Sequence, residues 1–235
     1  MCVNDLNMRK LLDISKLTIP TMAIGVSLWF VFEYAPIESN MGIVQKIFYF
    51  HVPSAYSMYL GWMVCTACSI AYITTQKETW DMGAKASAEL ALLFGIMVMI
   101  TGPLWGRKSW GAYWVWDPRL TSALLLTLII LSYVLLRSMV KGTATKKFSA
   151  ALAIVGAAII PLVHLSVYKW RGQHPTVLKS GGLEPEMLLT FGICMFTFTL
   201  VFIALFHQRY TLEKQVHLLA TLRQKNIAGQ EEATN

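Results

Sequence analysis

Long runs of hydrophobic residues alternate with short polar segments along the 235-residue chain. At about 1.5 Å of rise per helical residue, six of these runs can each cross the roughly 30 Å hydrocarbon core of a bilayer. The pattern predicts an all-α integral membrane bundle, with residues 1–235 forming a single polytopic domain. The six predicted spans are Leu17–Tyr34, Val52–Thr75, Ala84–Leu104, Arg119–Arg137, Phe148–Val167 and Glu186–His207.

Proline residues mark the beginnings of several predicted spans. Pro53, Pro118 and Pro185 fall in the first turn of three of them, where a backbone N–H donor is not needed. Asp117 precedes Pro118 and is a predicted N-cap. Residues 105–118 are expected to form the loop between the third and fourth spans.

The two ends of the chain carry charges outside the predicted spans. The first hydrophobic run follows Arg9, Lys10 and Lys16, but no small-x-small cleavage site follows it. We therefore expect this run to be retained as a membrane anchor. Residues 208–235 are expected to form a charged, frayed tail.

Composition and charge agree with a membrane protein. Charged residues make up only 14% of the chain, whereas soluble domains carry about 25%. The formal charge of +7 does not indicate a nucleic-acid partner, because the cations lie between the apolar runs and not on one amphipathic element. Of the Lys and Arg residues, 13 lie on the side that holds both termini and 7 on the other side. The positive-inside bias therefore predicts that both termini are cytoplasmic.

The loop after the third span is unusually rich in aromatic residues. One explanation is an interfacial belt, since Trp and Tyr favour the headgroup level of a bilayer. Another is an apolar wall for a large planar ligand, because five aromatic rings in one short loop exceed what a belt needs. Trp110 and Trp114 would share one face if this segment were helical. The five aromatic residues of the tract are Trp105, Trp110, Tyr113, Trp114 and Trp116.

Two histidines are predicted on the same outer side as this aromatic tract. His51 lies at the mouth of the second span and His174 in the last outer loop. Either alone is commonly an interfacial polar group, but a pair of neutral imidazoles can hold heme iron from both sides of the macrocycle. His164, inside the outer end of the fifth span, is a third candidate, because an ionisable group at membrane depth is often functional. The alternative is an interhelical hydrogen-bonding group or a residue that supports a ligand. His207 and His217 are predicted on the opposite side.

Charged residues near the tract have two interpretations each. Arg119 and Lys46 are either interfacial anchors or partners of the heme propionates, which prefer Arg and Lys. Asp117 is expected to act first as an N-cap and second as a group of the ligand shell. These residues, with the two histidines and the indoles, form the candidate site.

Two features of the spans lie outside this site. Cys65 and Cys68 form a CxxC pattern, but a redox pair requires an exposed helix N-terminus, so packing is the expected role. Glu89, near the cytoplasmic end of the third span, is costly in lipid and predicts a protein contact or a wet cavity.

The aromatic tract carries a family resemblance. The pattern Trp105–Gly106–x–x–x–Trp110–Gly111–x–x–Trp114–x–Trp116–Asp117–x–Arg119–Leu120–Thr121–Ser122 resembles the "WWD" signature of heme-handling membrane proteins of cytochrome c maturation. Within that superfamily the chain most closely resembles the CcmC family, heme exporter protein C. The resemblance extends to His51–Val52–Pro53, to Pro161–x–x–His164–x–Ser166–Val167 and to a histidine ten residues later.

The resemblance implies a site for heme b at the periplasmic face of the cell inner membrane. Its two axial histidines match His51 and His174, while Arg119 and Lys46 match the positions that bind propionates. Lys46 departs from the pattern because arginine is more familiar there, and Tyr113 stands where another tryptophan is expected. The indoles and carboxylate that cradle the macrocycle are matched by Trp105, Trp110, Trp114, Trp116 and Asp117.

The implied activity is presentation of heme without turnover chemistry. The family passes heme to the periplasmic chaperone CcmE and works with an ABC-type complex of CcmA and CcmB and with the small CcmD. Three alternatives remain at this point: a bis-histidine b-type electron carrier, a heme permease subunit, and a sibling of the same superfamily that performs the final heme ligation. The first usually draws its ligands from within spans, the second needs polar residues at mid-depth, and the third is generally longer.

Overall fold

The structure, a computed structural model, describes residues 17–169 and 183–234. Apart from an isolated bridge between Glu38 and Gly42, its regular structure is helical, and six of its helices are long and apolar enough to cross a membrane. The all-α membrane architecture is therefore confirmed. The elements in chain order are the first helix (Leu17–Tyr34, ending in the π-helix η1, Phe30–Tyr34), η2 (Ile43–Ile47), α2 (Phe48–Thr75), α3 (Glu78–Trp110), α4 (Pro118–Met139), α5 (Thr143–Ala157), α6 (Ile159–Lys169) and α8 (Pro185–Thr234).

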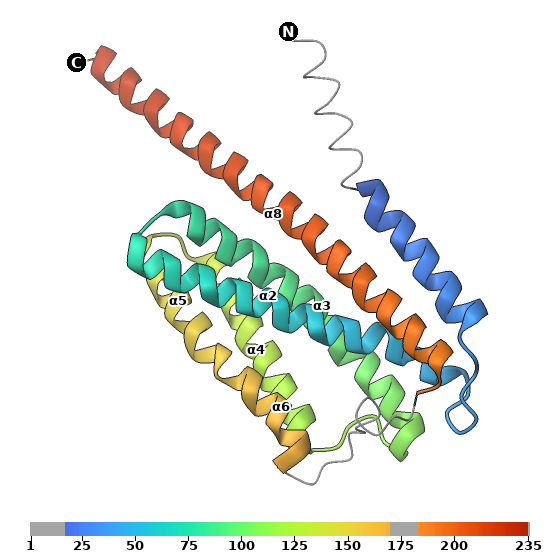
Figure 1. Cartoon of the computed structure of the whole chain (residues 1–235). Coiled ribbons are helices and arrows are strands. Elements are labelled where there is room, and N and C mark those ends of the chain that lie inside the picture. The colour runs from blue at the N-terminus through green and yellow to red at the C-terminus, as the bar shows by residue number, and fades with distance from the viewer. Residues whose placement is uncertain (1–16, 170–182, 235) are drawn as a thin grey trace.

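The antiparallel pair α2 and α3 forms the middle of the bundle (Figure 1). On one side α4 packs against α3, α5 packs against α2, and α6 packs against α4. On the other side α8 contacts both α2 and α3, and the first helix lies along α8. Because successive spans run in opposite directions, α2 begins, α3 ends and α4 begins at one end of the bundle. This end is called the aromatic end below, because it holds the tract 105–116.

Small residues let α2 and α3 approach closely. A Cβ atom at Gly61 would lie 3.1 Å from the backbone nitrogen of Ala91 and 3.1 Å from the carbonyl oxygen of Ser87. Next to this contact, the buried rings of Trp62 and Tyr133 meet edge to face at 5.7 Å. Without a hydrophobic drive between helices in lipid, such close packing is a principal source of helix association.

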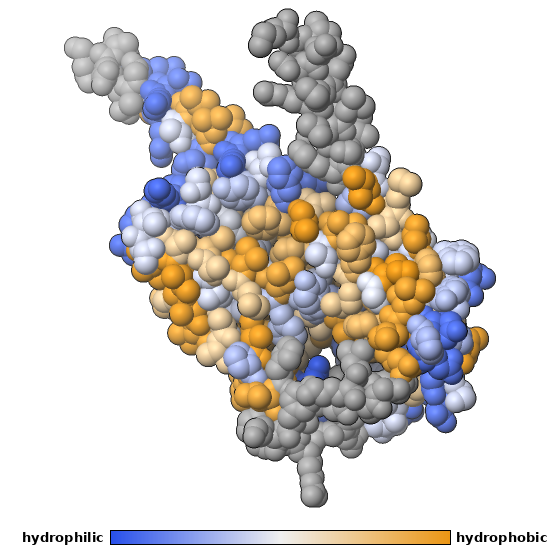
Figure 2. Space-filling model, viewed as in Figure 1, coloured by the Kyte–Doolittle hydropathy of each residue, from blue (hydrophilic) through white to orange (hydrophobic). Residues whose placement is uncertain are grey.

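The surface of the bundle has the polarity of a membrane protein. On the face drawn in Figure 2, hydrophobic side chains form a broad band across the middle, and hydrophilic ones collect toward the ends. Exposed leucines and isoleucines are frequent along the spans, for example Leu93, Ile96 and Ile100 on α3. A bilayer is the solvent in which such a surface is stable.

Ion pairs join the helices at the end opposite the aromatic tract. Arg137 of α4 contacts Asp81 of α3 at 2.6 Å, with both side chains less than a tenth exposed. Glu89, the acidic residue of the third span, contacts Arg209 of α8. Of the two environments predicted for Glu89, the protein contact is the one observed. The buried CxxC residues Cys65 and Cys68 are both free thiols, in keeping with packing.

The predicted fifth span is two helices. α5 ends at Ala157 and α6 begins at Ile159, with a turn at Ala158 between them. Pro161 accounts for the break, because it has no N–H to donate to the carbonyl of Ala157 and its ring clashes with that carbonyl. The two helices together supply the fifth candidate span, Thr143–Val163, so the predicted span is confirmed, but the break at Ala158 was not predicted.

Two other boundary predictions need correction. Pro53 is not in a first turn, since α2 begins at Phe48 and the proline lies inside the helix. The segment after His207 is not a frayed tail but the continuation of α8 to Thr234. Contacts with α3 stabilise this extension, which hydropathy alone could not indicate.

The expected loop 105–118 is shorter than predicted. α3 continues to Trp110 and ends at Gly111, whose φ of 79° is a left-handed conformation that suits glycine. Trp105 and Trp110 therefore lie on α3, and Trp114 lies in the connection. The condition under which Trp110 and Trp114 would share a helix face is therefore not met, because α3 ends at Trp110.

Candidate functional site

His51 projects from the first turn of α2 at the aromatic end. Its Nδ1 lies 2.8 Å from Oγ1 of Thr101 on α3, and the imidazole is partly exposed. A Cβ atom at Gly102 would lie only 3.2 Å from Cε1 of His51, so the ring lies directly against α3. Thr101 is one helical turn before Trp105, so these two residues share a face of α3. The histidine is thereby placed next to the beginning of the aromatic tract.

The tryptophans of the tract form two edge-to-face pairs. Trp105 and Trp110 have ring centroids 5.5 Å apart, and those of Trp114 and Trp116 are 5.6 Å apart. Gly106 makes room for the first pair, since a Cβ there would lie 2.6 Å from Cζ2 of Trp110. Trp105, Trp110 and Trp114 are half-buried, whereas Trp116 is 78% exposed. Three indoles of the tract are therefore packed against the protein, and the fourth, Trp116, is exposed.

Two indole N–H groups of the tract are buried without a partner. The Nε1 atoms of Trp110 and Trp114 make no hydrogen bond to any residue that the structure describes. A buried donor without an acceptor is unfavourable by about 1–3 kcal/mol. These two donors therefore suit an acceptor supplied by a ligand or by another part of the protein.

Asp117 and Arg119 organise the beginning of α4. The Asp117 carboxylate accepts a hydrogen bond of 2.7 Å from the backbone N–H of Leu120, which confirms the predicted N-cap. Arg119 is half-buried and lies within electrostatic range of His51 and of Tyr59. The structure thus brings a cation and an imidazole together at the aromatic end.

Lys46 has a partner in the first helix. Its ammonium donates a hydrogen bond of 3.0 Å to the carbonyl of Phe32 and lies 5.7 Å from the centroid of the Phe32 ring. Phe32 is in the last turn of the first helix, where carbonyls have no intrahelical donor. The lysine is 5% exposed and therefore connects η2 to the first helix.

The turn before η2 is closed by an acidic side chain. The carboxylate of Glu38 accepts hydrogen bonds from the backbone N–H groups of Met41 and Asn40, which hold its pKa below the usual value. This turn lies between Lys46 and the end of the first helix. It therefore helps to fix the approach of the chain to His51.

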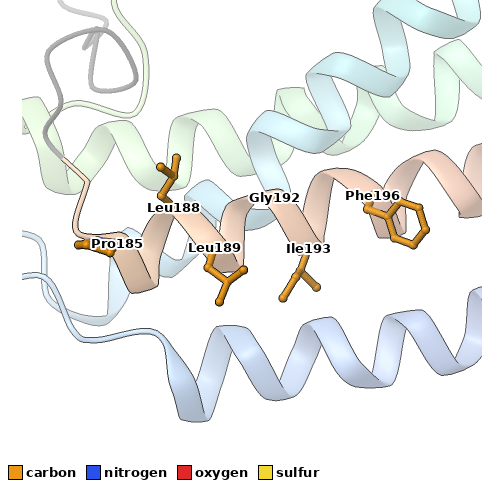
Figure 3. Close-up of a pocket in the computed structure, with 6 residues that line it drawn as sticks. All are labelled: Pro185, Leu188, Leu189, Gly192, Ile193 and Phe196. Atoms are coloured by element: carbon orange, nitrogen blue, oxygen red, sulfur yellow. The ribbon is translucent and has the colours of Figure 1, made fainter.

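An apolar hollow of about 560 Å³ lies away from these residues. Figure 3 shows Leu189 and Ile193 pointing from α8 toward the first helix, with Gly192 between them. None of the candidate site residues lines this hollow. All of its lining residues are on α8, so it is not part of the candidate site.

The structure gathers part of the predicted site. His51, Arg119 and the four tryptophans all lie at the aromatic end, on α2, α3, α4 and the α3–α4 connection. His174 lies outside the described residues, and so do the side-chain contacts of His164. Among residues 17–169 and 183–234, no group of three or more His, Cys, Asp or Glu residues is placed to hold a metal ion. The absence of such a cluster among these residues does not bear on a single ligand such as His51.

Sequence reasoning did not identify Thr101 or Gly102. Both contact the imidazole of His51, although they lie inside an apolar span where a threonine and a glycine attract little notice. Their spacing carried a signal: Thr101 is four residues before Trp105 and therefore faces the same way. Only the packing of α2 against α3 shows that the side chain next to Thr101 is His51.

Comparison with known proteins agrees with this arrangement. The model of the CcmC family, heme exporter protein C, matches residues 5–225. The heme exporter protein C of Bradyrhizobium diazoefficiens is 33% identical over 80% of this chain and 72% of its own. Those of Haemophilus influenzae (30% identical over 81% and 79%) and Rhodobacter capsulatus (28% identical over 83% of each chain) are similar along most of their lengths. This multi-pass membrane protein therefore belongs to the CcmC family of heme-handling proteins in cytochrome c biogenesis.

Proposed function

We propose that this protein binds heme b at the extracytoplasmic face of the cell inner membrane and presents it to the chaperone CcmE. His51 and His174 are the two axial ligands of the iron. The aromatic tract and Asp117 hold the edge of the macrocycle, and Arg119 meets a propionate. The protein works beside CcmA, CcmB and CcmD and performs no turnover chemistry itself.

The placement of His51 is the observation that carries this proposal. Its Nδ1 is engaged by Thr101, which leaves the other ring nitrogen for a ligand. Neutral imidazole is the usual protein ligand of heme iron. The half-buried indole of Trp105 lies one helical turn beyond Thr101, and the Arg119 guanidinium lies within electrostatic range of His51.

The polar groups of the tract also suit heme. A propionate carries acceptor oxygens and negative charge, which complement a guanidinium and buried indole donors. The unpartnered Nε1 atoms of Trp110 and Trp114 are such donors among the described residues. The names of the similar bacterial proteins, heme exporter protein C, support heme as the bound group.

In the proposed mechanism, the protein holds heme and then releases it to CcmE. His51 and His174 would hold the heme iron through their imidazoles, and this ligation would suppress oxygen chemistry. The chain's own residues orient the ring system and shield one edge with indoles. Trp116, with 78% of its surface exposed, marks the side on which an acceptor protein can approach.

The orientation in the membrane follows from the distribution of cations. The side that carries the termini and the ion pairs has 13 Lys and Arg residues, whereas the side of the aromatic end has 7. The positive-inside bias supports cytoplasmic termini and an extracytoplasmic aromatic end. A heme on that side is accessible to a periplasmic acceptor.

Spectra of purified variants test the ligand assignment. His51→Ala and His174→Ala are each expected to purify with depleted heme or altered Soret and α bands. His207→Ala is the matched control, since His207 is exposed on α8 toward the opposite end. Unchanged spectra in both site variants would refute the assignment.

Transfer to the chaperone is tested separately. We expect the wild-type protein to support formation of heme-loaded CcmE, and the two histidine variants to lose it. Rapid reduction of the bound heme by quinol, without transfer to CcmE, would instead indicate a b-type electron carrier.

A further inference from the structure

The imidazole of His51 is held by two consecutive residues of α3. Nδ1 is 2.8 Å from Oγ1 of Thr101, and Cε1 lies 3.2 Å from the position that a Cβ atom of residue 102 would take. His51 and Thr101 are 50 positions apart in the sequence. Such a contact fixes both the position and the rotation of the ring.

The hydrogen bonds around Thr101 have a direction. A threonine hydroxyl has one hydrogen to donate and lone pairs that accept. Oγ1 of Thr101 lies 2.6 Å from the carbonyl oxygen of Met97, which can only accept. The hydroxyl of Thr101 therefore donates its hydrogen to the carbonyl of Met97. Its Oγ1 must then accept a hydrogen bond from Nδ1–H of His51. This places the proton of the neutral imidazole on Nδ1 and leaves Nε2 with a free lone pair.

We infer that Thr101 is a positioning residue that selects the tautomer of His51 and presents Nε2 as the metal-binding nitrogen. The inference rests on the proposed function, in which His51 binds heme iron. A ligand nitrogen needs an unprotonated lone pair, and an acceptor on the opposite N–H both fixes the tautomer and raises ligand basicity. The chain Met97–Thr101–His51 provides this acceptor from within α3.

Gly102 completes the arrangement. With a Cβ atom at this position only 3.2 Å from Cε1, the ring would have to move by a few tenths of an ångström. Glycine therefore allows the imidazole to approach α3 closely enough for the bond to Thr101. The pair Thr101–Gly102 acts as one support for the ring.

The tautomer can be measured in the heme-free protein. Nitrogen-15 NMR of protein labelled at the histidine rings, in detergent micelles, distinguishes protonated from unprotonated nitrogens. The chain has five histidines, so the His51 signals are identified by their loss in His51→Ala. We expect a proton on Nδ1 in the wild type, a mixture or the Nε2–H form in Thr101→Val, and recovery of the wild-type form in Thr101→Ser.

Thr199→Val is the matched control. Thr199 is also half-buried in a helix and also donates to the carbonyl four residues earlier, that of Met195, at 2.8 Å. Its loss should leave the His51 signals unchanged. A wild-type His51 protonated on Nε2, or an unchanged tautomer in Thr101→Val, would overturn the inference. The wild-type measurement decides the matter even if Thr101→Val does not fold.

Heme-loaded protein gives a second readout. Thr101→Val is expected to raise the reduction potential and weaken heme binding by about 10-fold or more, because outer partners of metal-bound histidines have effects of that size. Thr101→Ser should stay close to the wild type, and so should Thr199→Val. Failure of the proposed ligation has a different signature: His51→Ala would then keep a wild-type heme spectrum, whatever the tautomer of His51 in the heme-free protein.

Discussion

Arg209 on α8 donates a hydrogen bond of 2.8 Å from Nη2 to Oε1 of Glu89 on α3. The same guanidinium lies 2.5 Å from Oε1 of Glu213, to which Lys85 of α3 also donates at 2.8 Å. Two acidic and two basic side chains thus join α8 to α3 where α8 continues beyond its most apolar part. This network ties the beginning of the α8 extension to α3.

Replacing Arg209 with alanine should loosen this extension. Glu89 loses its guanidinium partner, while Glu213 keeps Lys85. Since the side chains are partly exposed, the loss is about 1 kcal/mol or less. Hydrogen exchange of residues 210–227 should therefore accelerate by up to about fivefold, since 1.4 kcal/mol corresponds to a factor of ten. Gln208→Ala, an exposed neighbour, should exchange like the wild type, and an equal rate in Arg209→Ala would show that the network does not hold the helix.

Gly61→Ala should destabilise the bundle. Its added methyl group would meet backbone atoms of Ser87 and Ala91 at 3.1 Å, which cannot move aside as a side chain can. Overpacking of this kind usually reduces stability by about 1–3 kcal/mol. Gly192→Ala is the control, because a Cβ there meets nothing within 4 Å. Unfolding of both variants in mixed micelles measures the difference, and equal stabilities would contradict the close approach of α2 and α3.

Lys46→Met should release the first helix. The substitution keeps the apolar stem but removes the donor to the Phe32 carbonyl, a loss of about 1–2 kcal/mol. Thr197 donates to the carbonyl of Ala23 at 3.3 Å, so cysteines placed at these two positions can report the contact of α8 with the first helix. In a background without the native cysteines, we expect cross-linking to fall severalfold in Lys46→Met.

Lys108→Met is the control for Lys46, because Lys108 is exposed at the same end. Its cross-linking should equal that of the parent protein. A weaker Soret band with intact cross-linking in Lys46→Met would show that Lys46 binds a propionate and does not anchor the first helix.

Trp114→Ala should weaken heme retention. The half-buried indole pairs with Trp116 and carries one of the unpartnered N–H groups, so its removal takes away both an apolar surface and a donor. Aromatic contacts of this kind contribute about 0.5–1.5 kcal/mol each beyond their area, equivalent to up to about tenfold in affinity. Heme content after detergent washing measures the effect.

Trp80→Ala is the matched control for Trp114. Trp80 is 43% exposed at the beginning of α3, at the end opposite the tract. Its loss should leave heme content unchanged. Wild-type heme retention and wild-type levels of heme-loaded CcmE in Trp114→Ala would argue that the tract is only an interfacial belt.

Hydropathy by itself determined the class of the fold. A run of about twenty apolar residues has few alternatives to a spanning helix, because lipid cannot satisfy exposed backbone groups. Local chemistry determined the Asp117 cap in the same way, since a cap involves only the next few residues. The family, too, was readable from the tract Trp105–Ser122 and from His51–Val52–Pro53.

Tertiary structure alone decided which side chains meet across helices. The broken fifth span could have been foreseen from Pro161, but the bond between His51 and Thr101, the pairing of Glu89 with Arg209 and the burial of Lys46 against Phe32 could not. Each of these contacts joins two helices whose relative rotation and depth are set by the packing of the entire bundle. Hydropathy says that a residue lies in a span; only the close approach of helices, as at Gly61 and Gly102, determines which atoms it touches. The pairing of His174 with His51 remains a prediction, since it rests on the family resemblance.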